Sequence, residues 1–147
     1  MHTPATGYIF SGPRGVGKGL LANRFVKSLL CVDQTSANPC NKCSSCNITN
    51  VVMHGDYFEI SRMEGKITIG IEQIQVLIKS LQTKATISLY SVVLINESDL
   101  LSKSAANALL KILEEPQGRT VFILLDNRQF RILPTILSRC QQMYFKP

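Results

Sequence analysis

The sequence lacks any long apolar stretch and any sign of a leader. No run approaches the ~20 apolar residues that a helix needs to cross a bilayer, which excludes a membrane-spanning helix. The segment Met1–Pro4 and the residues after it carry no basic region followed by an apolar one, as a secretion signal would. Repeats and low-complexity tracts are also missing. We therefore expect a cytoplasmic protein with no membrane partner.

Acidic residues are missing from both ends of the chain. None precedes Asp33 and none follows Asp126, in a chain with 16 basic and 10 acidic residues and a net charge of +6. This charge permits contact with nucleic acid but does not establish it, because lysine and arginine are common on solvated surfaces. Aromatic residues do not interleave with the basic ones, as a stacking platform for single strands requires. A DNA-binding module stays an alternative, which a steep salt dependence of binding would support.

What the chain does contain is the composition of a folded domain with a full-sized core. It has 147 residues, of which 45% are apolar and 18% charged. Short apolar runs alternate with patterns of helical spacing, which predicts an α/β fold with a parallel sheet covered by helices on both faces. Strands are expected near residues 8–10, 57–60, 92–95, 121–125 and 141–145, and helices near 18–30, 71–81, 103–115 and 131–137. We expect residues 1–147 to form one domain around a five-stranded sheet.

An almost complete phosphate-binding loop follows the first predicted strand. The pattern is G-x-x-x-x-G-K-[ST], and Gly12, Gly17 and Lys18 fill its glycine and lysine positions, with Gly15 between them. Backbone N–H groups at the start of the next helix would face phosphate oxygens, and Lys18 would reach the terminal phosphates. The last position is Gly19, which has no hydroxyl group to offer a metal ion. The strand, loop and helix together predict a nucleotide-binding fold.

The positions that support magnesium in such enzymes are altered at two places. Gly19 replaces the Ser or Thr ligand, and Asn96 stands where an Asp usually ends a later strand. Glu97 could still orient a water molecule, and we assign it a vestigial catalytic role. We predict that the chain binds ATP with magnesium weakly and hydrolyses it poorly or not at all. Magnesium-dependent ATP turnover comparable to that of ordinary ATPases, which disappears in Lys18→Ala, would contradict this prediction.

Four cysteines are spaced as ligands of one metal ion. Their spacing is C-x8-C-x2-C-x2-C, which suits tetrahedral zinc. Disulfides are the competing interpretation, but a chain without a secretion signal argues against them. Four protein ligands leave no open position, so the zinc would be structural, within an insert over residues 31–46. The predicted ligands are Cys31, Cys40, Cys43 and Cys46, and we expect Cys140 to be a small packed residue.

The order of these motifs resembles a known family. After the phosphate loop and the cysteines come Asn107–Pro116 and Ile136–Cys140. This series resembles the AAA+ module of the bacterial sliding-clamp loader in the DNA polymerase III holoenzyme, from Gly7 to Phe145. The resemblance implies a P-loop NTPase domain that acts in DNA replication. It also implies gamma or tau and delta subunits as partners, with the sliding clamp and primed DNA reached through the complex.

Two zinc-bearing branches of this family are candidates. The gamma or tau branch is an ATPase, whereas the delta-prime branch resembles it but lacks a working ATP site. The segments His54–Tyr57 and Gly65–Ile71 resemble delta-prime, and Gly19 and Asn96 agree with it. The rest of the phosphate loop is closer to gamma. We favour a delta-prime-like stator, and the alternative is a gamma- or tau-like subunit that binds and hydrolyses ATP in cis.

The resemblance also gives roles to residues near the end of the chain. Arg139, in the Ser-Arg-Cys motif, would act as an arginine finger in trans on ATP held by a neighbouring gamma subunit, a Lys being a poor substitute. The alternative is an ordinary salt-bridged surface arginine. Asp126 and Asn127 take the place of a Thr that senses the nucleotide in gamma, and Asn127 could still donate a hydrogen bond. Family members add a lid domain and a helical collar that this sequence does not contain, so nucleotide closure and stable assembly are not implied.

Overall fold

The computed structural model describes residues 3–33, 38–47, 54–82, 87–127 and 132–146. Their elements are β1 (Gly7–Ser11), α1 (Lys18–Leu30), β2 (Tyr57–Ile60), α2 (Ile71–Leu81), β3 (Ser91–Ile95), the 3₁₀ helix η2 (Ser98–Leu100), α3 (Lys103–Glu114), β4 (Thr120–Asp126), α4 (Pro134–Leu137) and β5 (Gln141–Tyr144). The predicted strands and helices are confirmed within a few residues. The sequence did not predict η2, and the expected start of α4 near residue 131 lies outside the described residues.

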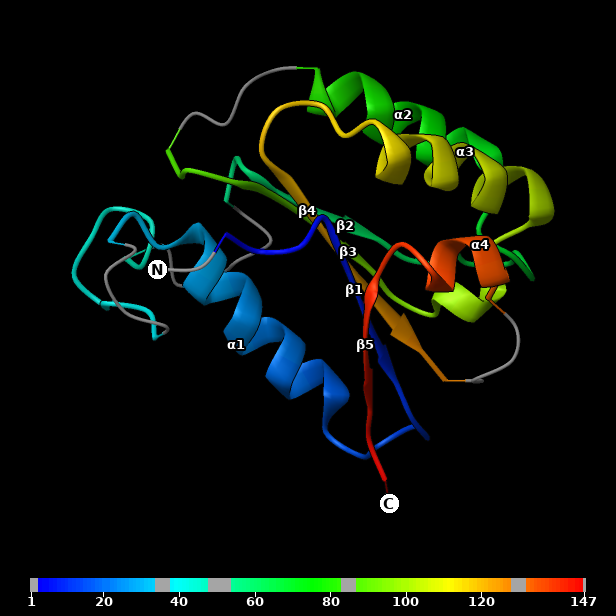
Figure 1. Cartoon of the computed structure of the whole chain (residues 1–147), viewed down its shortest axis with the longest axis horizontal. Coiled ribbons are helices and arrows are strands. Elements are labelled where there is room, and N and C mark those ends of the chain that lie inside the picture. Colours follow the sequence, from blue (N-terminus) through cyan, green and yellow to red (C-terminus); the bar gives the residue numbers. More distant parts are fainter. Residues whose placement is uncertain (1–2, 34–37, 48–53, 83–86, 128–131, 147) are drawn as a thin grey trace.

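The five strands form one parallel sheet in the order β2-β3-β4-β1-β5. Helix α1 covers one face, and α2, α3 and α4 cover the other (Figure 1). Every residue of β3 and β4 is buried, because both strands lie inside a sheet that is covered on both sides. The predicted α/β architecture is therefore confirmed. All five strands point the same way, so the loops after β1, β3 and β4 meet at one edge of the sheet.

Each face of the sheet has its own apolar cluster. Phe122 packs with the helices α2 and α3, whereas its neighbour Ile123 packs with α1, because side chains alternate along a strand. The apolar residues Leu21, Phe25 and Leu29 recur at helical spacing along α1, but they do not all lie on its buried face. Leu21 is 40% exposed, and the buried stripe of the helix includes Ala22 and Val26 instead. Helical spacing alone did not identify which of two adjacent apolar residues faces the sheet.

The start of α3 depends on its cap. The Ser102 hydroxyl accepts a hydrogen bond from the Ala105 N–H at 3.1 Å, so Ser102 is the N-cap of this helix. Among the described residues, no helix is both long enough and apolar enough to cross a membrane.

Candidate phosphate pocket and cysteine cluster

The phosphate loop connects the carboxyl end of β1 to the start of α1, and its glycines are required by geometry. Gly15 and Gly17 have φ angles of 79° and 103°, in the left-handed region that favours glycine. At Gly12 a Cβ atom would lie 2.8 Å from the Phe145 carbonyl oxygen. The glycine pattern read from the sequence therefore reflects two backbone turns and one close approach to the chain after β5.

A cavity of about 580 Å³ lies in front of this loop. The loop contributes Gly15, Gly17, Lys18 and Gly19 to its lining, and Arg14 lies beside them. The segments after β3 and β4 contribute three further predicted residues, which are Asn96, Glu97 and Asn127. Gly12 supports the loop from behind, where its N–H donates to the Asp126 carbonyl at 3.0 Å. The fold thus gathers the predicted phosphate-site residues at the carboxyl edge of the sheet.

Lys18 is held by the loop itself. Its Nζ donates to the carbonyl oxygens of Gly12 at 2.9 Å and Pro13 at 3.1 Å, and the residue is buried. Burial lowers the pKa of Lys18, and the negative charge of Asp126 opposes this shift. Asp126 is also buried and accepts a hydrogen bond from the Ser11 hydroxyl at 3.1 Å. The Asp126 carboxylate is therefore turned toward β1, and Asn127 is the residue of the pair that lines the cavity.

Asn96 has contacts that an aspartate could not make. Its Nδ2 donates to Glu59 Oε1 at 3.1 Å and to Ser61 Oγ at 2.9 Å. An ionised aspartate offers no donor and would repel Glu59. The amide therefore fastens the end of β3 to the end of β2, at the place where a magnesium enzyme would keep a carboxylate.

Glu97 is also engaged. It has a φ of 51°, and its Oε2 lies 3.3 Å from Arg14 Nη2 and 3.9 Å from Arg62 Nε. Both arginines come from loops at the same edge of the sheet. The vestigial role with water that we predicted for Glu97 stays a prediction, and its carboxylate forms ion pairs with two arginines.

Gly19 differs from the other loop glycines, because a Cβ atom there would meet open space. We expect Gly19→Ala to fold and to raise the free energy of unfolding by up to about 1 kcal/mol, since alanine favours a helix over glycine. Gly17→Ala is the matched control, and it should lower stability by roughly 1–2 kcal/mol because of its left-handed backbone. Urea denaturation of both variants measures this, and a destabilised Gly19→Ala would contradict the open space.

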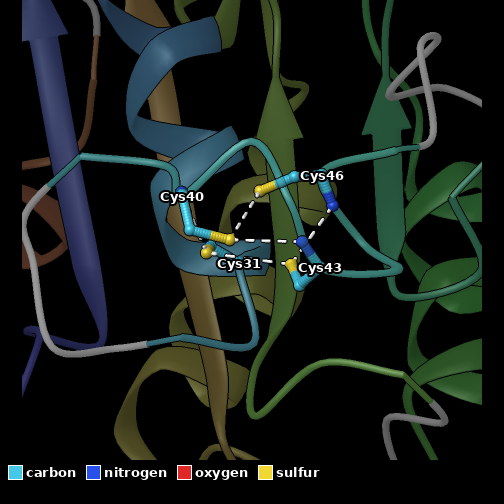
Figure 2. Close-up of side chains that lie close together, drawn as sticks. All are labelled: Cys31, Cys40, Cys43 and Cys46. Atoms are coloured by element: carbon cyan, nitrogen blue, oxygen red, sulfur yellow. Dashed lines mark hydrogen bonds between the residues drawn. The ribbon is translucent and has the colours of Figure 1, made fainter.

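The four predicted zinc ligands converge on one point (Figure 2). All four Sγ atoms lie within 4.8 Å of one another, with Cys31 and Cys43 at 3.9 Å and Cys40 and Cys46 also at 3.9 Å. A zinc ion with Zn–S bonds of about 2.3 Å would place tetrahedral sulfurs about 3.8 Å apart. None of these four cysteines forms a disulfide. The cluster is therefore compatible with structural zinc.

Backbone N–H groups favour the thiolate form of two of these cysteines. Burial pushes the pKa of Cys43 upward, but hydrogen bonds from the N–H groups of Cys46 and Val32, each 3.4 Å long, outweigh it and lower the pKa to about 6. The N–H groups of Lys42 and Cys43 lower the pKa of Cys40 in the same way. Such donors orient and stabilise the thiolates that bind metal.

A buried polar group joins the cysteine loop to the sheet. His54 Nδ1 accepts from the Asp56 N–H at 3.0 Å, so its proton is assigned to Nε2, which lies 2.8 Å from Ser45 Oγ. Asp56 Oδ2 accepts from the N–H groups of Ile87 at 2.8 Å and Ser88 at 2.7 Å. The segment His54–Tyr57 was identified only by its resemblance to the family, and this structural role was not predicted. The available sign in the sequence was that two polar residues, His54 and Asp56, directly precede a short strand.

The cysteine cluster and the phosphate pocket lie at opposite ends of helix α1. The loop precedes α1 and Cys31 follows it, so the 13 residues of the helix separate them (Figure 1). At a rise of 1.5 Å per residue this is about 20 Å. A metal ion held by the cysteines would therefore be too far away to contact a phosphate in the pocket.

Arg139 lies between α4 and β5, at the amino-terminal end of β5, whereas the pocket lies at the carboxyl ends of the strands. Its Nη2 lies 2.8 Å from Glu114 Oε1, and its Nη1 donates to the Thr135 carbonyl at 3.1 Å. The structure therefore does not bring Arg139 together with the phosphate-pocket residues. Of the basic residues near the end of the chain, Arg128 and Arg131 lie outside the described residues.

A phosphate loop before α1 in a parallel sheet of this order defines a P-loop domain of the AAA+ type, and solved structures agree. A gamma subunit-related DNA polymerase III protein of Thermotoga maritima matches with a TM-score of 0.68 at 23% identity, over 97% of this chain and 41% of that one. The RuvB Holliday junction branch migration motor of the same organism matches with a TM-score of 0.58 at 15% identity, over 99% of this chain and 38% of that one. These likenesses establish the fold.

Sequence comparisons establish the family. The model of the family described as DNA polymerase III, delta subunit, matches residues 1–147. The delta-prime subunit of Pseudomonas aeruginosa is 38% identical over 138 residues, which are 94% of this chain and 42% of that protein. The tau/gamma subunit of Haemophilus influenzae is 36% identical over 139 residues, which are 95% of this chain and 20% of that protein. The chain therefore belongs to the DNA polymerase III clamp-loader family of delta-prime, gamma and tau subunits, and it spans about two fifths of the length of its delta-prime relative.

Proposed function

We propose that the chain forms a single AAA+ domain of a delta-prime-like stator in the DNA polymerase III clamp loader. Its partners are gamma or tau and delta subunits, and it meets the sliding clamp and primed DNA through their complex in the cytoplasm. In this proposal Arg139 completes the ATP site of a neighbouring subunit, the chain's own ATP site is degenerate, and zinc bound by the cysteines holds the insert in place.

The observation that carries this proposal is the location of Arg139. Strand β5 separates it from the phosphate loop, because Gly12 packs against Phe145 at the far end of that strand. Five residues lie between Arg139 and Phe145, and at about 3.3 Å per residue they span roughly 16 Å or more. An arginine at that distance does not serve the chain's own phosphates. It is partly exposed, with 39% of its side chain accessible, so a neighbouring molecule can reach it.

The pocket supports the second half of the proposal. Gly19 offers no metal ligand. The Asn96 amide donates hydrogen bonds to Glu59 and Ser61, and Glu97 is paired with two arginines. Hydrolysis needs a metal ion to neutralise charge on the phosphates and a group that positions water. In this pocket the positions that would bind the metal ion are altered, and the carboxylate that would position water is paired with arginines. The chain alone is therefore expected to hydrolyse ATP poorly.

Reconstitution tests the proposal. The chain is mixed at micromolar concentration with gamma or tau and delta subunits, and ATP turnover is measured with clamp and primed DNA. We expect the chain alone to show background turnover and its addition to raise the turnover of the mixture. The alternative, a gamma- or tau-like ATPase, predicts magnesium-dependent turnover by the chain alone that disappears in Lys18→Ala. That result would reject the stator.

A further inference from the structure

We propose that the four clustered cysteines form a redox switch, in which a peroxide converts the metal-binding thiolates into two disulfides and the metal ion is released. The pairs are Cys31 with Cys43 and Cys40 with Cys46. This inference rests on the zinc site of the proposed function, but it goes beyond that function. It does not depend on Arg139 or on assembly with other subunits.

The contacts between the sulfurs are the first step. The Sγ atoms of Cys31 and Cys43 lie 3.9 Å apart, and so do those of Cys40 and Cys46 (Figure 2). These two contacts share no cysteine, so both bonds can form in one molecule. A disulfide bond is about 2 Å long, so each pair has to close by about another 2 Å, which rotation of the side chains can supply. Together the two bonds would use all four ligands and leave no thiolate for a metal ion.

Access for the oxidant is the second step. Cys31 is buried at the end of α1, whereas Cys40, Cys43 and Cys46 are only partly buried. Each pair therefore has at least one sulfur that a small peroxide can reach. The fifth cysteine in the sequence, Cys140, does not belong to this group of sulfurs. Oxidation of the cluster is therefore expected to join its own members.

The chemistry is the third step. A thiolate attacks one oxygen of hydrogen peroxide, the O–O bond breaks, and the products are a sulfenic acid and hydroxide. The thiolate of the paired cysteine then attacks the sulfenic sulfur and displaces a second hydroxide, which leaves a disulfide. Each pair gives two electrons to one peroxide, and two protons from the solvent convert the hydroxides to water. In a reducing compartment such disulfides are transient and typical of redox sensors, since a dithiol reverses them by exchange.

The fourth step is the coupling between the cluster and the sheet. Ser45 lies between Cys43 and Cys46 in the sequence, and its buried Oγ is 2.8 Å from His54 Nε2. Charged acceptors form stronger hydrogen bonds than neutral ones, so disulfides would weaken the bonds that backbone N–H groups donate to these sulfurs. Oxidation is therefore expected to loosen the insert. Five such bonds, 3.3–3.4 Å long, come from the N–H groups of Val32, Cys40, Lys42, Cys43 and Cys46.

Zinc release and mass spectrometry test the inference on the whole chain, purified in its reduced form. Zinc content is measured first, and hydrogen peroxide is then added in modest molar excess with a zinc-sensitive dye. We expect each chain to release one zinc ion and the denatured chain to lose the mass of four hydrogen atoms. Dithiothreitol and added zinc should restore the starting mass and zinc content. Amide hydrogen exchange should become faster around Ser45 after oxidation and stay unchanged in β3 and β4.

Peptide mapping and variants identify the pairs. Trypsin cleaves after Lys42, so the proposed disulfides link two tryptic peptides, and tandem mass spectrometry of the linked peptides assigns each bond. Cys31→Ser should lose only two hydrogen atoms, because the pair of Cys40 and Cys46 remains. Cys140→Ala is the matched control outside the cluster, and it should release zinc and lose four hydrogen atoms as the parent does.

Four results would overturn the switch. They are zinc that stays bound in the presence of peroxide, oxygen added to the sulfurs in place of hydrogen lost, disulfides in another pairing, and unchanged hydrogen exchange around Ser45. The zinc measurement made before oxidation separates this inference from the proposed function. A chain without zinc at that point would reject the zinc site together with the switch, whereas any of the four results in a zinc-bound chain rejects the switch alone.

Discussion

Replacing Arg139 with alanine is expected to lower ATP turnover by the reconstituted clamp loader by about 10³-fold, while the chain itself folds normally. An arginine supplied in trans neutralises charge that develops on the transferring phosphoryl group, and its loss has effects of this order. The folded chain loses an exposed pair with Glu114 and a contact to a backbone carbonyl, which contribute little to stability. Steady-state ATPase assays measure the first effect, and thermal denaturation of the variant measures the second.

Glu114 supplies the control for that experiment. Glu114→Gln removes the ionic partner of Arg139 but keeps the guanidinium group and an amide that can still accept a hydrogen bond. We expect turnover of the complex to change less than about threefold, because an exposed pair of this kind contributes only modestly. Arg139→Lys should behave like the alanine variant, since an ammonium group does not reproduce a paired contact. Full turnover with Arg139→Ala in an assembled complex would reject the finger.

The features that the sequence predicted well are those that depend on local pattern. The strands β3 and β4 were found because burial on both faces requires unbroken apolar runs. The cysteine spacing predicted one cluster because its ligands lie on one short loop and the end of α1. The buried face of α1 did not follow from helical spacing, because Leu21 and Ala22 are adjacent and both apolar, and only Ala22 is buried. The orientation of the helix after Gly17 decides which of the two residues faces the sheet, and this orientation cannot be predicted from the apolar pattern.

The features that the sequence missed depend on segments that meet in space. The pairs of Glu97 with Arg14 and Arg62 join three loops that follow different strands. His54 contacts Ser45 within the cysteine loop, and Asp56 caps the segment before β3. Polar partners of this kind have no fixed spacing along the chain. Their positions follow from the parallel order of the strands, which brings the loops to common edges.

Removing zinc is expected to unfold the cysteine insert and leave the sheet intact. Without a metal ion, nothing bridges the four sulfurs that lie within 4.8 Å of one another. Backbone donors lower the pKa of Cys43 to about 6, so this residue is a thiolate at neutral pH and has lost its cationic partner. The Ser45 contact to His54 would be lost with the insert. Structural zinc sites contribute several kcal/mol or more to folding, on the order of 10 kcal/mol in small zinc domains. Here most of the loss would fall on residues 31–46, because both apolar clusters lie elsewhere.

Elemental analysis and limited proteolysis test this together. We expect one zinc ion per chain, lost on treatment with a strong chelator and in Cys43→Ser, with new cleavage between residues 31 and 46 in both cases. Cys140→Ala is the matched control, because burial raises the pKa of that thiol to about 11 and it packs beside Gly7, apart from the cluster. It should keep its zinc and its protease resistance in the insert. A zinc-free chain with an unchanged cleavage pattern would show that the thiols hold the insert without metal.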